Sequence, residues 1–491
     1  MPPVRRGFRS CAILAAFLCA GSAAAQDLAP PTQPAESAAP PVALLAADDR
    51  GQAARLADAA LSGSGAFDVA RALTVEVGPR LAGSAGDRAA VVWGLRALPG
   101  LGLRNVRAEE VTVPHWERGT ASGWITAPYP QPVALTALGG SVGTSEEGIA
   151  AEVVRLDSLA ALRELPSDAL KGKIVFFDVA MERTPDGTGY GRAVGVRGRG
   201  ASEAAKRGAA AVLIRSIGTD RNRLPHTGAL RYAEDAPRIP AAALSGPDAD
   251  LLAAQVASGR PVAFRLLLTA RLLSDAVSSN VVGEIPGREA PEEIVLLGCH
   301  LDSWDLGTGA QDDAAGCAIV LAAARLLGEL PRPPRRTVRV VLFANEEFGL
   351  SGARAYAAAH AAELGSHVVA AEADSGAGRV WRFATRVAPE ALGLAAEIAA
   401  VLAPLGIEPG GNEANGGADI GPLRRLGVPV VSLQQDMSGY FDVHHTANDT
   451  LDKIGPTDLD QPAAAFAAFA FLAAEAPTDF GRLPPETDSP F

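Results

Sequence analysis

After Ser278 the chain alternates between short, continuous apolar runs and longer segments with helical spacing. The apolar runs cover residues 294–299, 338–344, 368–371 and 428–433, and two helical segments between them cover 314–330 and 351–360. A continuous apolar run is typical of a strand that is covered on both faces. The alternation therefore predicts an α/β fold with a mostly parallel mixed sheet flanked by helices. Ligands of such sheets bind at the carboxyl ends of the strands.

Ionisable side chains follow these runs, and each group also has a structural interpretation. His-x-Asp is common in surface turns, an Asp pair caps helices, and adjacent glutamates are usually solvated. Together the groups supply imidazoles and carboxylates but no thiolate, which suits two zinc ions with an open position for water. The residues are His300, Asp302, Asp312, Asp313, Glu346, Glu347, Asp374, His444 and His445.

These motifs resemble the di-zinc aminopeptidase family that also contains glutamate carboxypeptidases. The similarity extends from about residue 55 to 475 and includes segments outside the candidate ligands. They are VGPRLAGS at 77–84, VPHWERG at 113–119, SVGT at 141–144, PHTG at 225–228 and GCHLDSWD at 298–305. The resemblance implies the zinc-exopeptidase fold, which is phosphorylase/hydrolase-like, and two Zn²⁺ ions as cofactors.

The resemblance also implies a role for each residue. His300 would bind one zinc and Asp302 would steady it, while Asp312 would bridge both metals through a cis Asp312–Asp313 peptide. Glu347 would share a metal with His445 or His300. Asp374 would complete the ligand shell of the metal that Glu347 does not bind, and Glu346 would be the general base. The family's final ligand precedes Thr or Ser, then two residues, an acid and Thr, which selects His445 over His444.

The implied function is an exported exopeptidase that hydrolyses dipeptides or short peptides with free termini. Water activated by the metals would attack the peptide carbonyl, with Glu346 as the base. An aminopeptidase for longer peptides, a non-catalytic scaffold relative and a one-zinc cyclase on the same fold are the alternatives. The partners are a peptide substrate and, by resemblance, a second copy in a homodimer.

Residues 132–273 differ in character, with β-like runs at 174–177 and 211–214 and one amphipathic helix at 201–207. We expect a β-rich module inserted into a catalytic domain of residues 51–131 and 274–478. It resembles the protease-associated domain that family members carry as a lid. Tyr440, Phe441 and His226 are candidates for the substrate pocket, although His226 also fits a structural role.

The first 25 residues have the pattern of a signal peptide, with Arg5, Arg6 and Arg9 before an apolar run and a small-residue cleavage site at 23–25. Cleavage would make the protein secreted or periplasmic, and an uncleaved anchor is the alternative. We expect residues 26–50 to form an Ala/Pro-rich linker and residues 479–491 to form a tail. No other run is long and apolar enough to span a bilayer, so we expect no membrane insertion after the leader is removed.

The net charge of −12 and its scattered distribution argue against binding to nucleic acid or anionic membranes. Two of the four cysteines lie in the leader, which leaves Cys299 and Cys317. Two cysteines are too few for a disulfide framework. We expect both to be buried free thiols, with a single bridge as the alternative.

Overall fold

The computed structural model describes residues 44–486, which lie in one compact unit. The predicted leader and most of the predicted linker fall outside the described residues. No helix within 44–486 combines the length and the apolar character that a membrane span requires.

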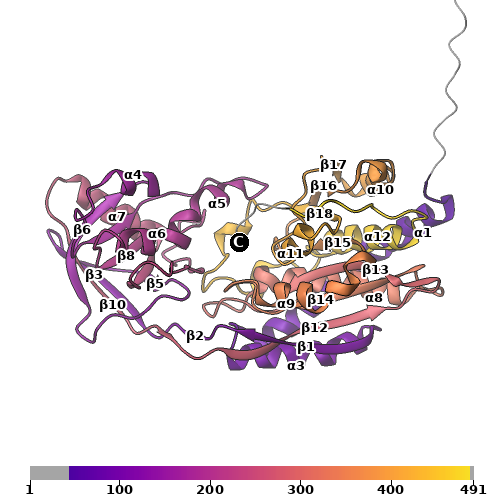
Figure 1. Ribbon diagram of the computed structural model, residues 1–491, viewed down its shortest axis with the longest axis horizontal. Helices are drawn as coiled ribbons and strands as arrows, with labels where there is room; N and C mark the ends of the chain where they lie inside the picture. Colours follow the sequence, from indigo (N-terminus) through magenta and orange to yellow (C-terminus); the bar gives the residue numbers. More distant parts are fainter. Residues whose placement is uncertain (1–43, 487–491) are drawn as a thin grey trace, which may run out of the picture. The chain divides into compact units, whose positions relative to one another are not determined.

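The main sheet has eight strands in the order β1-β12-β14-β13-β15-β18-β16-β17 (Figure 1). Its strands are β1 Arg104–Val113, β12 Ala276–Ile285, β13 Ala290–His300, β14 Arg336–Phe343, β15 His367–Glu372, β16 Val380–Arg386, β17 Glu408–Pro409 and β18 Val430–Gln435. The central four, β14-β13-β15-β18, are parallel. Strands β1 and β12 pair antiparallel with their neighbours, while β16 pairs antiparallel with β18 and parallel with β17. The expected mixed α/β sheet with a parallel centre is confirmed.

Helices cover both faces of this sheet. One face carries α1 Ala47–Leu61, α2 Ala66–Ala72, α3 Ala85–Gly100, α8 Ala315–Gly328, α10 Leu392–Leu402 and α12 Asp460–Glu475. The other carries α9 Ser351–Ala359 and α11 Gly421–Arg425. Helix α12 is buried from Gln461 to Ala474, because its Ala-rich sequence lets α1 and α8 pack closely against it.

Two separate helices, α1 and α2, stand at the start of the described chain instead of one continuous helix. Gly63 and Gly65 lie between them with φ of 137° and 73°. A positive φ is easily adopted by glycine but breaks a right-handed helix. The second helix therefore starts afresh at Ala66.

A second eight-stranded sheet has the order β4-β3-β10-β6-β7-β8-β9-β5. Its strands are β3 Ala121–Ala127, β4 Gln131–Val133, β5 Leu135–Ala137, β6 Ile149–Leu156, β7 Ile174–Phe177, β8 Ala211–Arg215, β9 Ala241–Leu244 and β10 Ala263–Leu268. The sheet thus begins at Ala121, before the expected border at 132. A short ribbon of β2 Trp116–Glu117 and β11 Arg271–Leu272 lies on the chain segments that enter and leave it.

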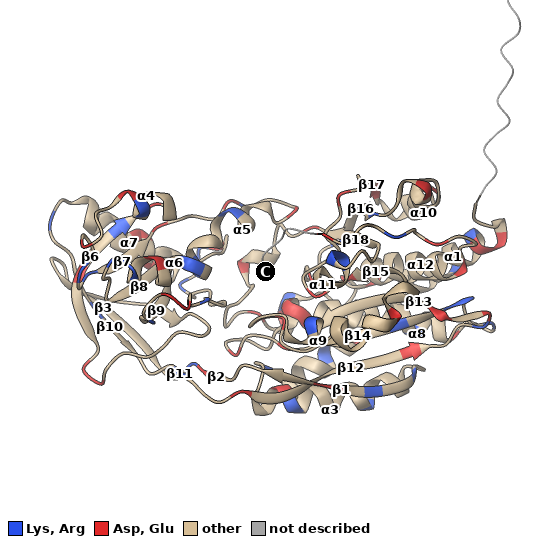
Figure 2. Cartoon of the chain, in the orientation of Figure 1, with Lys and Arg blue, Asp and Glu red and all other residues tan. Residues whose placement is uncertain are grey.

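The second sheet has more helices than the sequence predicts. Instead of one helix at 201–207 there are four, α4 Leu159–Glu164, α5 Thr188–Ala193, α6 Gly195–Ala205 and α7 Gly246–Ala257. Helices α4 and α5 have six residues each, too few to show helical spacing, and three glycines interrupt the apolar pattern of α6. Lys and Arg are interspersed with Asp and Glu over the elements of both sheets (Figure 2).

Cys299 and Cys317 form a disulfide bond, so the expectation of two free thiols is wrong. Both residues are fully buried, as expected. The turn after β13 brings the first turn of α8 back against the strand end, and the two Cα atoms come within 5.1 Å of each other. That separation is within the range that a disulfide requires. Sequence spacing alone does not reveal this approach.

Candidate metal centre

The five predicted metal ligands come from segments far apart in the chain and meet at one edge of the main sheet. His300 is the last residue of β13, while Glu347 and Asp374 follow β14 and β15. Because these three strands are parallel, their carboxyl ends lie together. Asp312 precedes α8, and His445 belongs to the loop after β18.

The carboxylate of Asp312 lies at the centre of the group. Its Oδ1 is 3.1 Å from His300 Nε2, and its Oδ2 is 3.2 Å from His445 Nε2. Asp374 Oδ1 lies 3.5 Å from the same His300 nitrogen. Glu347 Oε2 lies 2.9 Å from His445 Nε2. One donor set therefore consists of His300 and Asp374, and the other of His445 and Glu347. Asp312 belongs to both sets.

The donors have the character of a cation site. Asp312 Oδ2 and Glu347 Oε1 are buried and accept no hydrogen bond within the described residues. Burying carboxylates without a partner is costly unless a cation or proton offsets their charge. Ligand atoms of His300, Asp312 and Asp374 also lie within 4.8 Å of one another, as a metal would require. The residues present thus fit bound metal ions.

His444 competes with His445 as a ligand, since its imidazole also lies near Asp312. Its Nε2 is 3.7 Å from Asp312 Oδ2, farther than that of His445. The two rings stack with centroids 3.5 Å apart. Burial and the neighbouring His445 hold the pKa of His444 well below its usual range. His445 is the better placed donor.

Hydrogen bonds donated to two further aspartates, Asp302 and Asp449, hold the ligand segments in place. Asp302 accepts from the backbone N–H groups of Glu346, at 2.9 Å, and Glu347, at 3.3 Å, and its carbonyl oxygen is 3.1 Å from His300 Nδ1. Asp449 accepts from the backbone N–H of Asp312 at 3.2 Å. Asp449 is the acid of the motif that selects His445, four residues before it, but the sequence assigned no role to Asp449 itself. The Asp312–Asp313 peptide is cis, as the resemblance implies.

Glu346 lines a cavity of about 630 Å³ together with Asp312, Glu347 and Asp374. Burial, reinforced by the neighbouring carboxylates Asp374, Asp302 and Asp312, raises the pKa of Glu346 to about 8. The carboxyl group is therefore close to the ligands and in contact with the space where a substrate would bind.

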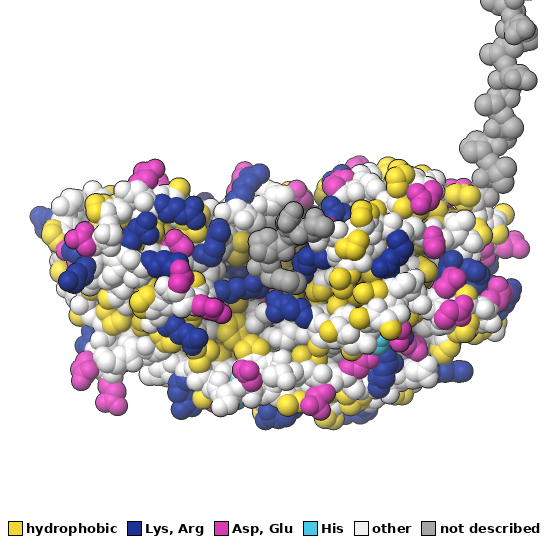
Figure 3. Space-filling view, in the orientation of Figure 1, with side chains coloured by type: hydrophobic (Ala, Val, Ile, Leu, Met, Phe, Trp, Pro, Cys, Tyr) yellow, Lys and Arg dark blue, Asp and Glu magenta, His cyan; other side chains and the backbone are white. Residues whose placement is uncertain are grey.

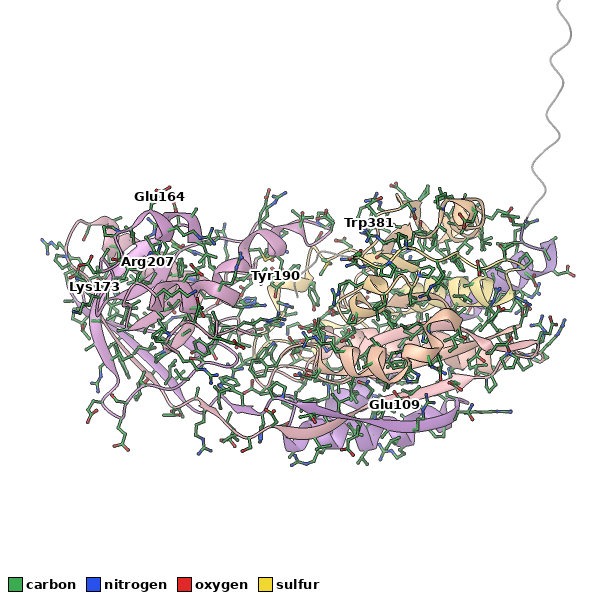
Figure 4. All side chains as sticks on the ribbon, in the orientation of Figure 1. Glu109, Glu164, Lys173, Tyr190, Arg207 and Trp381 are labelled. Atoms are coloured by element: carbon green, nitrogen blue, oxygen red, sulfur yellow. A yellow bond between two sulfur atoms is a disulfide. The ribbon has the colours of Figure 1, made fainter. Side chains whose placement is uncertain are left out.

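The opposite wall of the cavity comes from the helices of the second sheet. Arg197 of α6 has its Nη1 3.5 Å from His445 Nδ1, and its Nη2 donates to the hydroxyl of Tyr190. Tyr190 belongs to α5 and is labelled in Figure 4 at the edge of these helices. Thr227 donates its N–H to the carbonyl of His445 at 3.0 Å. No sequence motif pointed to Arg197 or Tyr190, because their roles arise only from this approach.

Of the three predicted pocket residues, Tyr440 and Phe441 line the cavity and His226 does not. His226 Nδ1 lies 2.7 Å from the carbonyl oxygen of His444, and its Nε2 lies 3.0 Å from Asp220 Oδ1. Both ring nitrogens are thus occupied by partners beneath the cavity wall. The structural role that the sequence left open for His226 agrees with this geometry.

Comparison with known proteins gives the family. Residues 280–470 match the model of Peptidase family M28. Carboxypeptidase Q of Rattus norvegicus is 38% identical over 399 residues, which cover 81% of this chain and 83% of the relative. The chain belongs to peptidase family M28. The predicted enzyme class, a metallopeptidase of this family close to carboxypeptidase Q, is confirmed.

Solved structures agree with this membership in M28. The Peptidase M28 precursor from Shewanella amazonensis SB2B has a TM-score of 0.88 at 48% identity, covering 89% of this chain and 99% of that one. A zinc aminopeptidase from Bacillus subtilis has a TM-score of 0.57 at 20% identity, with 82% and 93% coverage. The second likeness shows a shared fold only.

Proposed function

We propose that the chain is an exported two-zinc exopeptidase that hydrolyses dipeptides or short peptides with free termini. The observation that carries this proposal is the sharing of the Asp312 carboxylate, whose two oxygens face two different imidazoles, His300 and His445. A bridging carboxylate between two donor sets is what a pair of adjacent cations requires. Membership in M28 supports the same reading.

His300 and Asp374 would hold one zinc, Glu347 and His445 the other, and Asp312 both. Zinc is favoured because the donors are imidazoles and carboxylates, and both cysteines near the site are bonded to each other. When bound, two zinc ions polarise a peptide carbonyl and lower the pKa of a water molecule.

Glu346 is the general base in this proposal. Its backbone is fixed by Asp302, and its carboxyl group opens onto the cavity. It takes the proton of the attacking water and delivers that proton to the leaving amine. Cations bound beside it would favour the ionised carboxylate, so that Glu346 could accept a proton near neutral pH.

The second sheet acts as a lid over this site. Arg197 and Thr227 contact His445 from that side, and Arg197 lines the cavity opposite the metal ligands. A cavity bounded by two walls favours short peptides over long ones. An aminopeptidase for longer peptides is the alternative, and a non-catalytic scaffold is disfavoured because every donor and the base are in place.

We also infer export through the leader of residues 1–25, and a homodimer by analogy with the family. The first inference predicts a mature chain that begins near Gln26. N-terminal sequencing of protein recovered from the medium or periplasm tests it, and an intact leader on that protein would contradict cleavage.

A panel of dipeptides, assayed with and without a chelator, tests the catalytic proposal. Glu346→Gln should keep its zinc and lose about a thousandfold in kcat, because proton transfer contributes on this scale. Glu408→Gln, an exposed site on β17, is the matched control and should behave as wild type. Normal turnover by Glu346→Gln would remove Glu346 from its role.

A further inference from the structure

The cavity beside the metal ligands has walls of opposite charge. Carboxylates of the main sheet form one wall, while Arg197, Arg199 and Arg231 line the other. Lys and Arg side chains also gather between the two sheets on the face seen in Figure 3. A substrate that carries both charges at a short separation would complement such a space.

The three arginines are held near one another by α6 and the loop that follows β8. Arg197 and Arg199 belong to α6, and the backbone N–H of Arg231 donates to the carbonyl of Gly198 at 2.9 Å. Arg197 also packs over Gly228, where a Cβ atom would lie 2.3 Å from its Nη1. Gly228 has φ of +130°, which other residues rarely adopt. The backbone is thus shaped to admit the Arg197 guanidinium.

These guanidinium groups lack the partners that arginines usually have. Within residues 44–486, none of the three forms an ion pair with a carboxylate, and the buried Nε of Arg197 has no hydrogen-bond partner. The partners of Arg197 are neutral, the hydroxyl of Tyr190 and the carbonyl oxygen of Thr227, apart from the nearby ring of His445. Arginines elsewhere on the second sheet, such as Arg192, pair with acids.

Building on the function proposed above, we propose that Arg197, Arg199 and Arg231 bind the terminal carboxylate of a dipeptide or tripeptide substrate. Guanidinium groups bind carboxylates strongly and with defined geometry. Arg197 Nη1 lies 3.5 Å from His445 Nδ1, and Arg199 and Arg231 line the same cavity. An extended dipeptide spans roughly 7 Å and a tripeptide roughly 10 Å, so we place the free C-terminus of such a peptide against the arginines and its first peptide bond at the metal ligands. A longer chain would place an uncharged peptide unit there and leave the arginines without an anion.

The first test compares a dipeptide with its C-terminal amide on the zinc-loaded enzyme. Wild type should favour the free acid by about a hundredfold in kcat/KM, because charged hydrogen bonds are lost with the amide. In Arg199→Gln/Arg231→Gln this acid-to-amide preference should fall about tenfold, mainly through KM. Arg192→Gln, on neighbouring α5, is the control for the loss of a positive charge. Equal cleavage of acid and amide by wild type, or an unchanged preference in the double variant, would overturn the proposal.

A dipeptide amide with a glutamate side chain distinguishes the two sources of carboxylate. The proposal expects it to be as poor a substrate as other amides, and cleavage as fast as the free acid would overturn the terminal assignment. Binding of a dipeptide with a reduced, uncleavable peptide bond, measured by calorimetry as acid and amide, keeps the test separate from catalysis. Tighter binding of the free acid than of the amide would support the arginine subsite. If wild type bound the acid more tightly but hydrolysed no peptide, only the proposed exopeptidase activity would be refuted.

Discussion

The two walls of the cavity are built in different ways. On the main sheet, His300 and Asp312 are only 1% and 4% exposed, and backbone hydrogen bonds from several segments fix their neighbours. On the second sheet, Arg199 and Arg231 are exposed, with no ion pair to fix them among the described residues. The proposed metal ligands are therefore buried and held by many contacts, while the arginines proposed to meet the substrate are exposed and have few.

The largest effect should follow from removing the donor that both metals would share. In Asp312→Asn one bridging oxygen becomes an amide, so we expect zinc content to fall from two ions per chain towards zero and kcat/KM to drop by about ten thousandfold. Elemental analysis and dipeptide hydrolysis measure the two quantities. Asp250→Asn, at an exposed site paired with Arg215, is the control. Full zinc content in Asp312→Asn would show that the main-sheet wall is not organised around this residue.

A smaller effect should follow from removing the disulfide bond next to His300, which we expect to lower the stability of the protein. Cys299 precedes His300 in the chain, and its disulfide bond to Cys317 links two residues that are 18 positions apart. Cys299→Ala/Cys317→Ala should lower the free energy of unfolding by about 3 kcal/mol. Urea unfolding measures it, with the reduced wild type as the reference. An unchanged unfolding midpoint in oxidised and reduced protein would mean that the bond does not support this wall.

The smallest effect should come from the second-sheet wall. Tyr190→Phe removes the hydroxyl that accepts from Arg197, and we expect KM for free-acid dipeptides to rise about threefold. Burial raises the pKa of Tyr190 to about 12, so the hydroxyl stays protonated below pH 10 and the difference from wild type should be flat between about pH 6 and 9. Tyr129→Phe, at an exposed site, is the control. A difference that changes steeply over this range would contradict the assignment.

The same contrast separates what the sequence could predict from what it could not. His300, Glu347 and Asp374 lie at the ends of apolar runs, so periodicity alone placed them at one edge of the sheet. The resemblance supplied Asp312 and the choice of His445 over His444. These residues depend on local patterns that a single sequence carries.

The second-sheet wall depends on tertiary contact instead. Arg197 is one arginine among many, and its proximity to His445 exists only because two sheets meet. The helices α4 and α5 were missed because six residues are too few to show helical spacing. The disulfide was missed because Cys299 and Cys317 approach through a turn whose path the sequence does not specify.

Diffraction from crystals of the zinc-loaded protein, recorded on both sides of the zinc absorption edge, tests the central claim most directly. We predict two anomalous peaks, one on each side of the Asp312 carboxylate, the first against His300 and Asp374 and the second against Glu347 and His445. A single peak, or peaks away from these five side chains, would contradict a two-metal centre bridged by Asp312.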